Sequence, residues 1–334
     1  MSLNTIFAAL RGEGPLRVIS KEAKGVTMDA EQIEYEKQKV VKMFGKWTAH
    51  NIHLGEGVYT IGKDLQGDEI KLWRIVQIIT DLSNGLLHNL RILDLACLEG
   101  LYGIELARHG AQVVGIEGRE SNLEKAQLSK RILNLDNITI YKDDVRNLNV
   151  AKYGHFDVVL CLGILYHLDA PDVFTFLENI LSVAQKFVII DTHVSLSADR
   201  VYTYKEKKYW GETYVEHPPI ATAAEKEKEL WASIDNPLSF WLTRNSLFNC
   251  LSHFGFTSVY ECQIPEEVEK AIDRFTFVAM KGERAQLKVC PQLPPLYHRD
   301  LPDKLSTFWR RARNLIYQKL KIFAKWVRYK RHGN

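Results

Sequence analysis

The sequence predicts an α/β fold built on a mostly parallel β-sheet. From Leu90 onward, short apolar segments alternate regularly with helical patterns, which is typical of a doubly wound parallel sheet. Two more apolar segments, 257–264 and 274–282, are joined by too few residues for a crossover helix, so one of them is expected to be antiparallel. Together they make seven strands, the first five of which are expected at residues 91–96, 112–117, 138–143, 156–163 and 186–191.

The regions around this sheet follow from helical periodicity and composition. Residues 29–44 have the pattern of an amphipathic helix that ends at Gly45, and a second helix is expected near 70–82, so 1–84 are interpreted as a helical N-terminal extension. Residues 85–283 are expected to form the main domain, with an aromatic insertion over 193–243.

The C-terminal part differs in composition. A Pro-rich linker is expected over 284–302, and a basic amphipathic helix over 303–334. The last segment carries ten Lys or Arg and one Asp, a net charge of +9, so the other residues carry −6 of the total of +3. Partners are therefore expected separately for the acidic body and the basic tail.

Composition excludes several classes of protein. The five cysteines are scattered and none form a C-x-x-C pair, which argues against a disulfide framework or a zinc site and favours a reducing cytoplasm. The N-terminal residues lack the pattern of a signal peptide, and no apolar run is long enough to cross a bilayer. We therefore expect a cytoplasmic protein.

Acidic residues at the strand ends indicate a nucleoside-binding site. A dinucleotide fold needs several glycines after the first strand, so that backbone can approach a pyrophosphate. Here Ala96 and Leu98 occupy the usual glycine positions, and Gly100 is the one firm glycine of the loop. S-adenosylmethionine has no phosphate and fits such a loop better.

Four acids have positions that match the parts of this ligand. Glu117, at the end of the second strand, can chelate two ribose hydroxyls, and Asp144, after the third strand, can accept a hydrogen bond from the adenine amino group. Asp94 and Glu99 are expected to place negative charge near the sulfonium.

In this ordered set the chain resembles the class I S-adenosylmethionine-dependent methyltransferases. The resemblance covers Leu90 to Gly282 and includes the segment "FDVVLCLGILYHL" after Asp144. It implies a Rossmann-like fold and S-adenosyl-L-methionine as cofactor. The cofactor-binding residues that it implies are Asp94, Ala96, Cys97, Gly100, Glu117, Asp144, Val145, Cys161 and Leu162.

Within that superfamily, "GILYHLDAP" resembles the tRNA wobble-uridine carboxymethyltransferase group and its uncharacterised relatives. That group uses carboxy-S-adenosylmethionine, whose extra carboxylate is held in part by a lysine. An alignment by eye puts Glu56 at this lysine, where a carboxylate would repel the extra charge. We therefore expect ordinary methyl transfer.

Candidate catalytic residues follow the fourth and fifth strands. His167 can remove a proton from a hydroxyl acceptor, and Tyr166 beside it can line the pocket. Asp191 and His193 lie on one face at the end of the fifth strand and are candidates for acid–base or substrate-binding roles. Structural roles for all four remain alternatives. A metal held by Asp191, His193 and a further histidine is only weakly supported by so few ligands, and no metal is predicted.

The insertion supplies candidate acceptor contacts. Its aromatic side chains can form a lid, because flat rings stack on sugars or aromatic substrates at little entropic cost. Packing of these rings into a core of the insertion itself is the alternative. The residues expected to contact the acceptor are Tyr204, Trp210, Trp241 and Arg244.

Taken together, these features predict O-methylation of a small-molecule, sugar or lipid-precursor hydroxyl. A tRNA-modifying enzyme is the alternative among enzymes: the basic tail favours it, but the acidic body does not. A non-catalytic, methyltransferase-like binding scaffold is the alternative from another class.

The tail generates a first prediction. Apolar residues recur over 303–334 at helical spacing and lysines or arginines surround them, the pattern of a helix lying on an anionic membrane. The apolar stripe consists of Leu305, Phe308, Trp309, Ala312, Ile316, Leu320, Phe323 and Val327. The full chain is expected to float with anionic liposomes at low salt and to be released at high salt.

The matched control is a chain that ends at Leu293, which is expected to stay folded and to ignore the liposomes. Docking of the helix on its own domain or on a second subunit is the alternative. In that case the intact chain would not bind liposomes, or the shortened chain would unfold.

Overall fold

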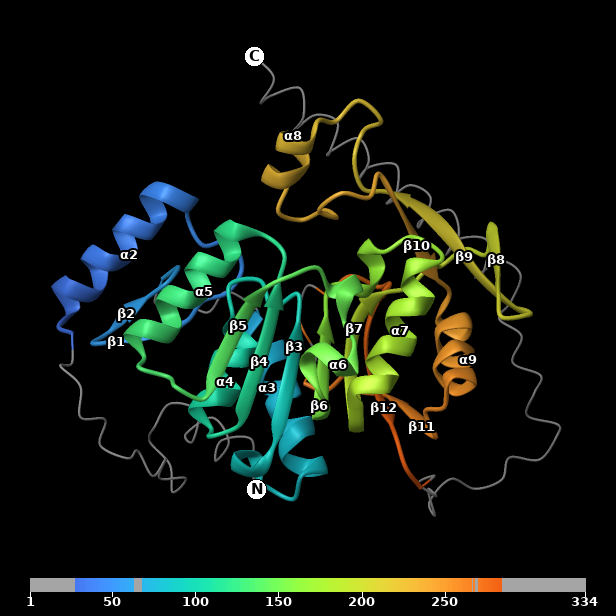
Figure 1. Ribbon diagram of the computed structural model, residues 1–334, viewed down its shortest axis with the longest axis horizontal. Coiled ribbons are helices and arrows are strands. Elements are labelled where there is room, and N and C mark those ends of the chain that lie inside the picture. The colour runs from blue at the N-terminus through green and yellow to red at the C-terminus, as the bar shows by residue number, and fades with distance from the viewer. Residues whose placement is uncertain (1–27, 63–67, 266, 268–269, 284–334) are drawn as a thin grey trace. The chain divides into compact units, whose positions relative to one another are not determined.

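Figure 1 shows the computed structural model, which describes residues 28–62, 68–265, 267 and 270–283. The predicted linker at 284–302 and the predicted helix at 303–334 lie outside the described residues.

The core is a seven-stranded sheet in the order β11-β12-β7-β6-β3-β4-β5. Strand β12 runs antiparallel to both of its neighbours, and the other pairings are parallel, so the predicted α/β fold with one antiparallel strand is confirmed. The central strands are nearly continuous apolar runs because both faces of the sheet are covered. The strands are β3 (Arg91–Leu95), β4 (Gln112–Glu117), β5 (Ile138–Lys142), β6 (Phe156–Leu162), β7 (Ala184–His193), β11 (Ser258–Glu261) and β12 (Arg274–Met280).

Helices cover the two faces of this sheet, as in a doubly wound fold. On one face, α3 and α4 pack on Ile92, Val158 and Ile189. On the other, α7 and α9 pack on side chains that alternate with these along the same strands. The helices of this domain are α3 (Asp68–Leu82), α4 (Leu101–Arg108), α5 (Glu120–Ile132), α6 (Val150–Tyr153), α7 (Asp172–Val183) and α9 (Arg244–Phe254), with 3-10 turns η1 (Leu87–Asn89), η2 (Val145–Asn147) and η3 (Leu165–His167).

The strand order reverses at β3. Strands β4 and β5 follow on one side of β3, and the chain then returns to place β6 and β7 on the other side. In open α/β sheets, ligands bind outside the carboxyl ends of the strands at such a switch point. The loops after β3, β4, β5 and β6 are therefore the structural candidates for a site.

The insertion forms a small sheet of its own (Figure 1). Strands β8 (Arg200–Tyr204), β9 (Lys207–Val215) and β10 (Leu238–Leu242) pair antiparallel, and α8 (Ala223–Lys228) lies between β9 and β10 in the chain. The rings of Tyr202, Tyr204 and Tyr209 lie against Phe174 of α7 at centroid distances of 5.5, 5.0 and 5.0 Å. Part of the aromatic content therefore packs the insertion onto the main domain.

The described part of the N-terminal extension contains more than helices. Helix α2 (Ala30–Phe44) begins at a capping box made by Asp29 and Gln32, and it is followed by a hairpin of β1 (His53–Gly55) and β2 (Val58–Tyr59). Val40 of α2 and Trp47 pack in one cluster with Leu128 of α5. The extension is thus anchored to the main domain through α5.

The buried carboxylate of Glu99 holds the next part of this extension. It accepts hydrogen bonds from the amides of Thr48, Ala49 and His50, at 2.9 to 3.2 Å, and pairs with the ammonium of Lys125 at 3.1 Å. Both charged side chains are fully buried. The expectation that Glu99 faces a sulfonium is therefore wrong, because protein donors occupy its carboxylate.

This pair generates a second prediction. Glu99→Gln leaves the Lys125 charge buried without its ionised partner, so the free energy of unfolding is expected to fall by about 3 kcal/mol. Urea denaturation measures the change. The matched control is Glu105→Gln, which removes the partly exposed pairs of Glu105 with Arg108 and His109 and is expected to cost less than about 1 kcal/mol. Equal losses in the two variants would contradict a special role for the buried pair.

Candidate active site

The loop after β3 has a left-handed backbone at two residues that are not glycine. Ala96 and Leu98 both have φ of +50°, a region that glycine normally occupies and that costs an L-residue about 1–2 kcal/mol. Gly100, with φ of +89°, then begins α4. The positions recognised as usual glycine positions thus keep the glycine conformation although the residues have changed.

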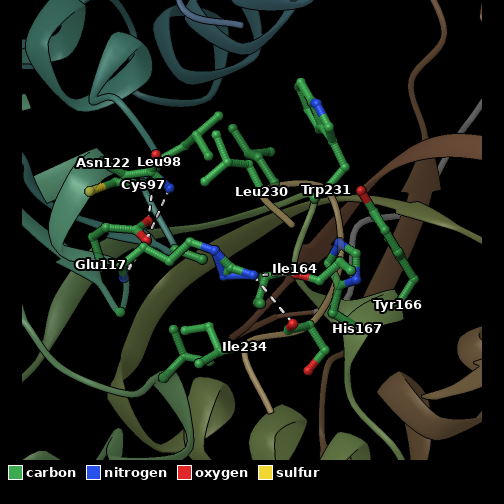
Figure 2. Close-up of a pocket in the computed structure, with 18 of the residues that line it drawn as sticks. Cys97, Leu98, Glu117, Asn122, Ile164, Tyr166, His167, Leu230, Trp231 and Ile234 are labelled. Atoms are coloured by element: carbon green, nitrogen blue, oxygen red, sulfur yellow. Dashed lines mark hydrogen bonds between the residues drawn. The ribbon is translucent and has the colours of Figure 1, made fainter. Parts of the chain in front are cut away.

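One carboxylate joins this loop to the end of β4. Glu117 accepts a hydrogen bond from the amide of Leu98 at 2.8 Å and another from the amide of Arg119 at 2.9 Å. Burial raises the pKa of Glu117, and the two amide hydrogen bonds act in the opposite direction. Figure 2 shows Glu117 at one side of a pocket, next to Leu98, Cys97 and Asn122.

Two buried polar atoms beside Glu117 have no protein partner within the described residues. They are Oδ1 of Asn122 and Nε of Arg119, and both residues line the pocket. A buried polar atom without a hydrogen-bond partner costs free energy. A ligand that carries hydroxyl groups would supply the missing partners at this wall. This wall suits a ribose.

The end of β3 and the loop after β5 supply the next two acids. Asp94 is buried and accepts a hydrogen bond from the amide of Gly103 at 3.1 Å. Burial, with a further contribution from the charge of Glu117, raises the pKa of Asp94 to about 7. Asp144 also lines the pocket, but its carboxylate is paired with the guanidinium of Arg146, with Oδ2 2.9 Å from Nε.

His167 lies on the opposite side of the pocket, paired with an acid from the insertion. Its Nδ1 is 3.0 Å from Oε2 of Glu216, a side chain that also accepts from the amide of Ser233 and the hydroxyl of Ser239, at 2.9 and 2.8 Å. Burial by itself raises the pKa of Glu216, but these hydrogen bonds outweigh it and lower the pKa overall. An ionised Glu216 accepts the Nδ1 proton and leaves Nε2 of His167 able to accept another.

Tyr166 also lines this end of the pocket (Figure 2). Its ring meets the ring of His193 edge-on at 4.8 Å, and the Arg274 guanidinium lies 5.8 Å from its centroid. Burial raises the pKa of Tyr166, so the phenol stays neutral near pH 7. Its predicted role in catalysis stays a prediction.

Asp191 and His193 have protein partners and lie outside the lining of this pocket in the part of the chain that the structure describes. Asp191 is bonded to Nε of Arg274 at 2.6 Å and to the hydroxyl of Thr276 at 2.7 Å. Burial alone raises the pKa of Asp191, but the charge of Arg274 and those of neighbouring lysines keep it below its usual range. His193 pairs with Asp273 at 3.0 Å. Their predicted catalytic roles stay predictions.

Three of the four candidate acceptor side chains are engaged in protein contacts. Tyr204 donates to Glu178, Trp241 donates from its indole to the carbonyl of Tyr166, and Arg244 pairs with Glu261. Trp210 is 44% exposed. Among the described residues, none of these four lines the pocket, and their acceptor role stays a prediction.

Besides Arg119 and Arg146, two further basic side chains that the sequence did not single out line the pocket. Lys71 comes from α3 and Arg274 from β12. Glu56, by contrast, is exposed in the turn between β1 and β2. The expected repulsion of a carboxylated cofactor by Glu56 is therefore wrong, because that side chain faces solvent.

Most of the implied cofactor residues are brought together. Gly100 and Cys161 lie outside the lining: Gly100 begins α4, and Cys161 is fully buried inside β6. The implied residues that do line the pocket are Asp94, Ala96, Cys97, Glu117, Asp144, Val145 and Leu162.

Comparisons with known proteins identify the domain. Residues 92–186 match the family model described as "Methyltransferase domain". The N-terminal domain of EvdMO1, in a crystal structure with S-adenosylhomocysteine (SAH) and D-fucose present, has a TM-score of 0.59 and 25% identity, over 78% of this chain and 100% of that one. The chain contains a class I S-adenosylmethionine-dependent methyltransferase domain. Its cofactor is S-adenosylmethionine, which agrees with the ribose-type wall beside Glu117.

Relatives of this methyltransferase domain among curated proteins include O-methyltransferases. The ubiquinone biosynthesis O-methyltransferase of Acinetobacter baumannii (strain AYE) is 30% identical over 107 residues, or 32% of this chain and 43% of the relative. The enzyme of the same name from Proteus mirabilis (strain HI4320) is 28% identical over 177 residues, or 52% of this chain and 67% of the relative. The chain thus spans less than half the length of the first of these.

The site of the methyltransferase domain uses residues that sequence reasoning missed. Arg119 and Asn122 complete the wall beside Glu117, and Lys71 and Arg274 add positive charge to the lining. Glu216 pairs with His167 of the other wall without lining the pocket in the described chain. Asn122, five residues after Glu117, falls on the first turn of α5 and was within reach of pattern reasoning. The pairing of His167 with Glu216 spans 49 residues and has no local signal.

The walls generate a third prediction. Glu117→Ala removes a ribose acceptor and also frees the amides of Leu98 and Arg119, so affinity for S-adenosylmethionine and for SAH is expected to fall at least about tenfold. Isothermal titration calorimetry measures both ligands. The matched control is Glu120→Ala, an exposed acid three residues later that pairs with Lys142 and is expected to leave both affinities unchanged. Unchanged affinity in Glu117→Ala would contradict the assignment of Glu117 as the residue that binds the ribose.

Proposed function

We propose that the domain transfers the methyl group of S-adenosylmethionine to a hydroxyl oxygen of a small molecule, with a sugar hydroxyl as the favoured acceptor. The observation that carries the proposal is the pair of His167 and Glu216 at the side of the pocket opposite Glu117. A hydroxyl is a poor nucleophile until its proton is removed, and histidine is the usual agent near neutral pH.

The residues of this chain divide the work between two walls. Bound cofactor supplies an electrophilic methyl group. Glu117 and Asn122 hold its ribose, and Asp94 is the acid that can balance a positive charge in the pocket. On the other wall, Nε2 of His167 accepts the proton of the acceptor hydroxyl. The carboxylate of Glu216 fixes the tautomer through Nδ1 and stabilises the imidazolium that forms.

The chemical class of acceptor is supported by the names of relatives. The structure of the EvdMO1 domain was obtained in the presence of D-fucose, a sugar, and it aligns over the whole of that domain. The relatives from Acinetobacter and Proteus are named as O-methyltransferases of ubiquinone biosynthesis. The names of these relatives and the sugar present with the EvdMO1 domain both favour oxygen as the methyl acceptor. The sugar is favoured because the alignment covers all of the EvdMO1 domain and only part of the ubiquinone enzymes.

A second candidate function is carboxymethyl transfer, as in the tRNA wobble-uridine group that the sequence resembles. Lys71 and Arg274 both line the pocket, with Arg274 close to Gly163 and Tyr166. Two cations favour binding of an additional carboxylate, and Glu56 is too exposed to oppose it. The donor is therefore varied in the test below.

The location of the enzyme is part of the proposal. No helix of the described residues has both the length and the apolar character that a bilayer crossing requires. We propose a cytoplasmic enzyme that residues 303–334 bring to the inner face of a membrane and to a lipid-linked acceptor. The liposome experiment described above tests the membrane contact.

Transfer of labelled methyl groups tests the function and gives a fourth prediction. Wild-type protein is incubated with labelled S-adenosylmethionine, or with its carboxylated form, and a panel of 6-deoxyhexoses, phenols and tRNA. We expect methylation of a sugar hydroxyl, and we expect His167→Ala to lower kcat by about 10²–10⁴-fold with little change in SAH affinity.

The matched control is His88→Ala, because His88 is exposed near the opposite ends of the strands. Glu216→Gln is expected to lower kcat by a smaller factor than His167→Ala. Label found only in tRNA would favour the second candidate, and so would a requirement for the carboxylated donor. Full activity of His167→Ala would remove His167 from the chemistry, and no transfer to any acceptor would favour a binding scaffold.

A further inference from the structure

A short segment of the insertion closes part of the pocket. We call residues 229–236, between α8 and β10, the covering segment. Leu230, Trp231 and Ile234 of this segment line the pocket, and Figure 2 shows them around the space between Glu117 and His167. Trp231 and Ile234 are 55% and 41% exposed, whereas Ala232 and Ser233 are buried. The burial of Ala232 and Ser233 therefore fixes the segment, and the packing of its large side chains contributes less.

What holds it is one guanidinium from the cofactor-binding wall. Nη2 of Arg119 donates to the carbonyls of Glu229 and Ala232, both at 2.9 Å, and to that of Ser233 at 3.2 Å. Arg119 is 3% exposed and directly precedes α5. Since its partners are backbone carbonyls, the hold does not depend on the side chains of the covering segment.

The far end of the same segment reaches the His167–Glu216 pair. The amide of Ser233 donates to Oε2 of Glu216 at 2.9 Å, and the side-chain amide of Asn236 donates to the carbonyl of His167 at 3.1 Å. At the near end, the amide of Arg119 donates to Glu117. A continuous series of hydrogen bonds thus runs from the ribose-binding carboxylate to the proposed base.

We propose that Arg119 is a positioning residue that couples cofactor binding to the alignment of His167 and Glu216, by holding the covering segment over the pocket. The role of the His167–Glu216 pair in chemistry rests on the proposed function; the coupling to cofactor binding does not. Glu117 sits at one end of the series, so a ligand on its carboxylate stabilises Arg119 and, through it, the closed segment. By linkage, an intact segment strengthens cofactor binding. Opening of the segment is then a step in product release.

The close approach of the covering segment also explains why the residue between Glu117 and Arg119 is a glycine. A Cβ on Gly118 would lie 2.4 Å from Cδ1 of Ile234. The covering segment therefore approaches the backbone beside Glu117 as closely as packing allows, which is the geometry expected of a closed state.

The test uses the full chain and SAH, so it needs no acceptor. In wild type, SAH is expected to slow hydrogen–deuterium exchange of the amides in 229–236 at least about tenfold. Arg119→Met is expected to lose this protection and to bind SAH at least about tenfold more weakly, because a charged donor of several hydrogen bonds is removed. Arg119→Lys should recover part of both effects. The matched control is Arg131→Met, an exposed arginine in the last turn of α5, which should behave as wild type.

A double-mutant cycle separates coupling from a merely structural role. Glu216 does not line the pocket in the described chain, yet Glu216→Gln is expected to weaken SAH binding about three- to tenfold when Arg119 is present, by a smaller factor when it is Lys, and not at all when it is Met. Equal weakening in all backgrounds would overturn the proposal, and so would wild-type exchange that SAH leaves unchanged.

Two further outcomes keep the test decisive. If Arg119→Met fails to fold, as judged by circular dichroism, the wild-type exchange and the cycle with Arg119→Lys decide. If no hydroxyl acceptor is methylated, the proposed function fails while these binding measurements stand or fall by themselves.

Discussion

The geometry of the site depends on two hydrogen bonds to the carboxylate of Glu117. This carboxylate is the point where the loop after β3 and the turn after β4 meet, because it accepts the amide of Leu98 from one and that of Arg119 from the other. In most nucleotide-binding loops, glycines allow the backbone to fold tightly near the ligand. Here a buried acid draws the two loops together, so the tight shape survives although Ala96 and Leu98 replace glycines.

This arrangement has an energetic consequence. Two non-glycine residues with φ of +50° cost about 1–2 kcal/mol each relative to relaxed backbone. A charged acceptor of two backbone amides offsets a large part of that cost, since hydrogen bonds to charged groups contribute about 1.5–3 kcal/mol. The strain is therefore located at the ligand-binding loop and is offset within it, which is where strained backbone commonly persists.

The sequence was informative where the chemistry is local and uninformative where it is not. Asp94 and Glu117 each end an apolar strand, so alternation and spacing were sufficient to predict both the parallel sheet and the wall that they form. Glu99 follows the strand that contains Asp94, but its carboxylate binds the amides of Thr48 and its neighbours. It also pairs with the buried ammonium of Lys125, which lies 26 residues further along the chain. Pattern reasoning has no access to such long-range partners. The same limit explains why Glu216 was missed and why Glu56 was misplaced, since a hairpin turn carries that residue to the surface.

The main domain and the insertion each contribute residues to the site. The parallel sheet supplies the cofactor wall, and its own loop supplies His167, but the carboxylate that fixes the tautomer of His167 comes from the end of β9. A histidine alone would sample both tautomers and orientations; a buried, ionised Glu216 selects one. Glu216 in turn accepts a hydrogen bond from the amide of Ser233, in the covering segment whose backbone Arg119 holds. In the proposed function the insertion is therefore part of the catalytic apparatus, because it supplies both Glu216 and the segment that lines the pocket between Glu117 and His167.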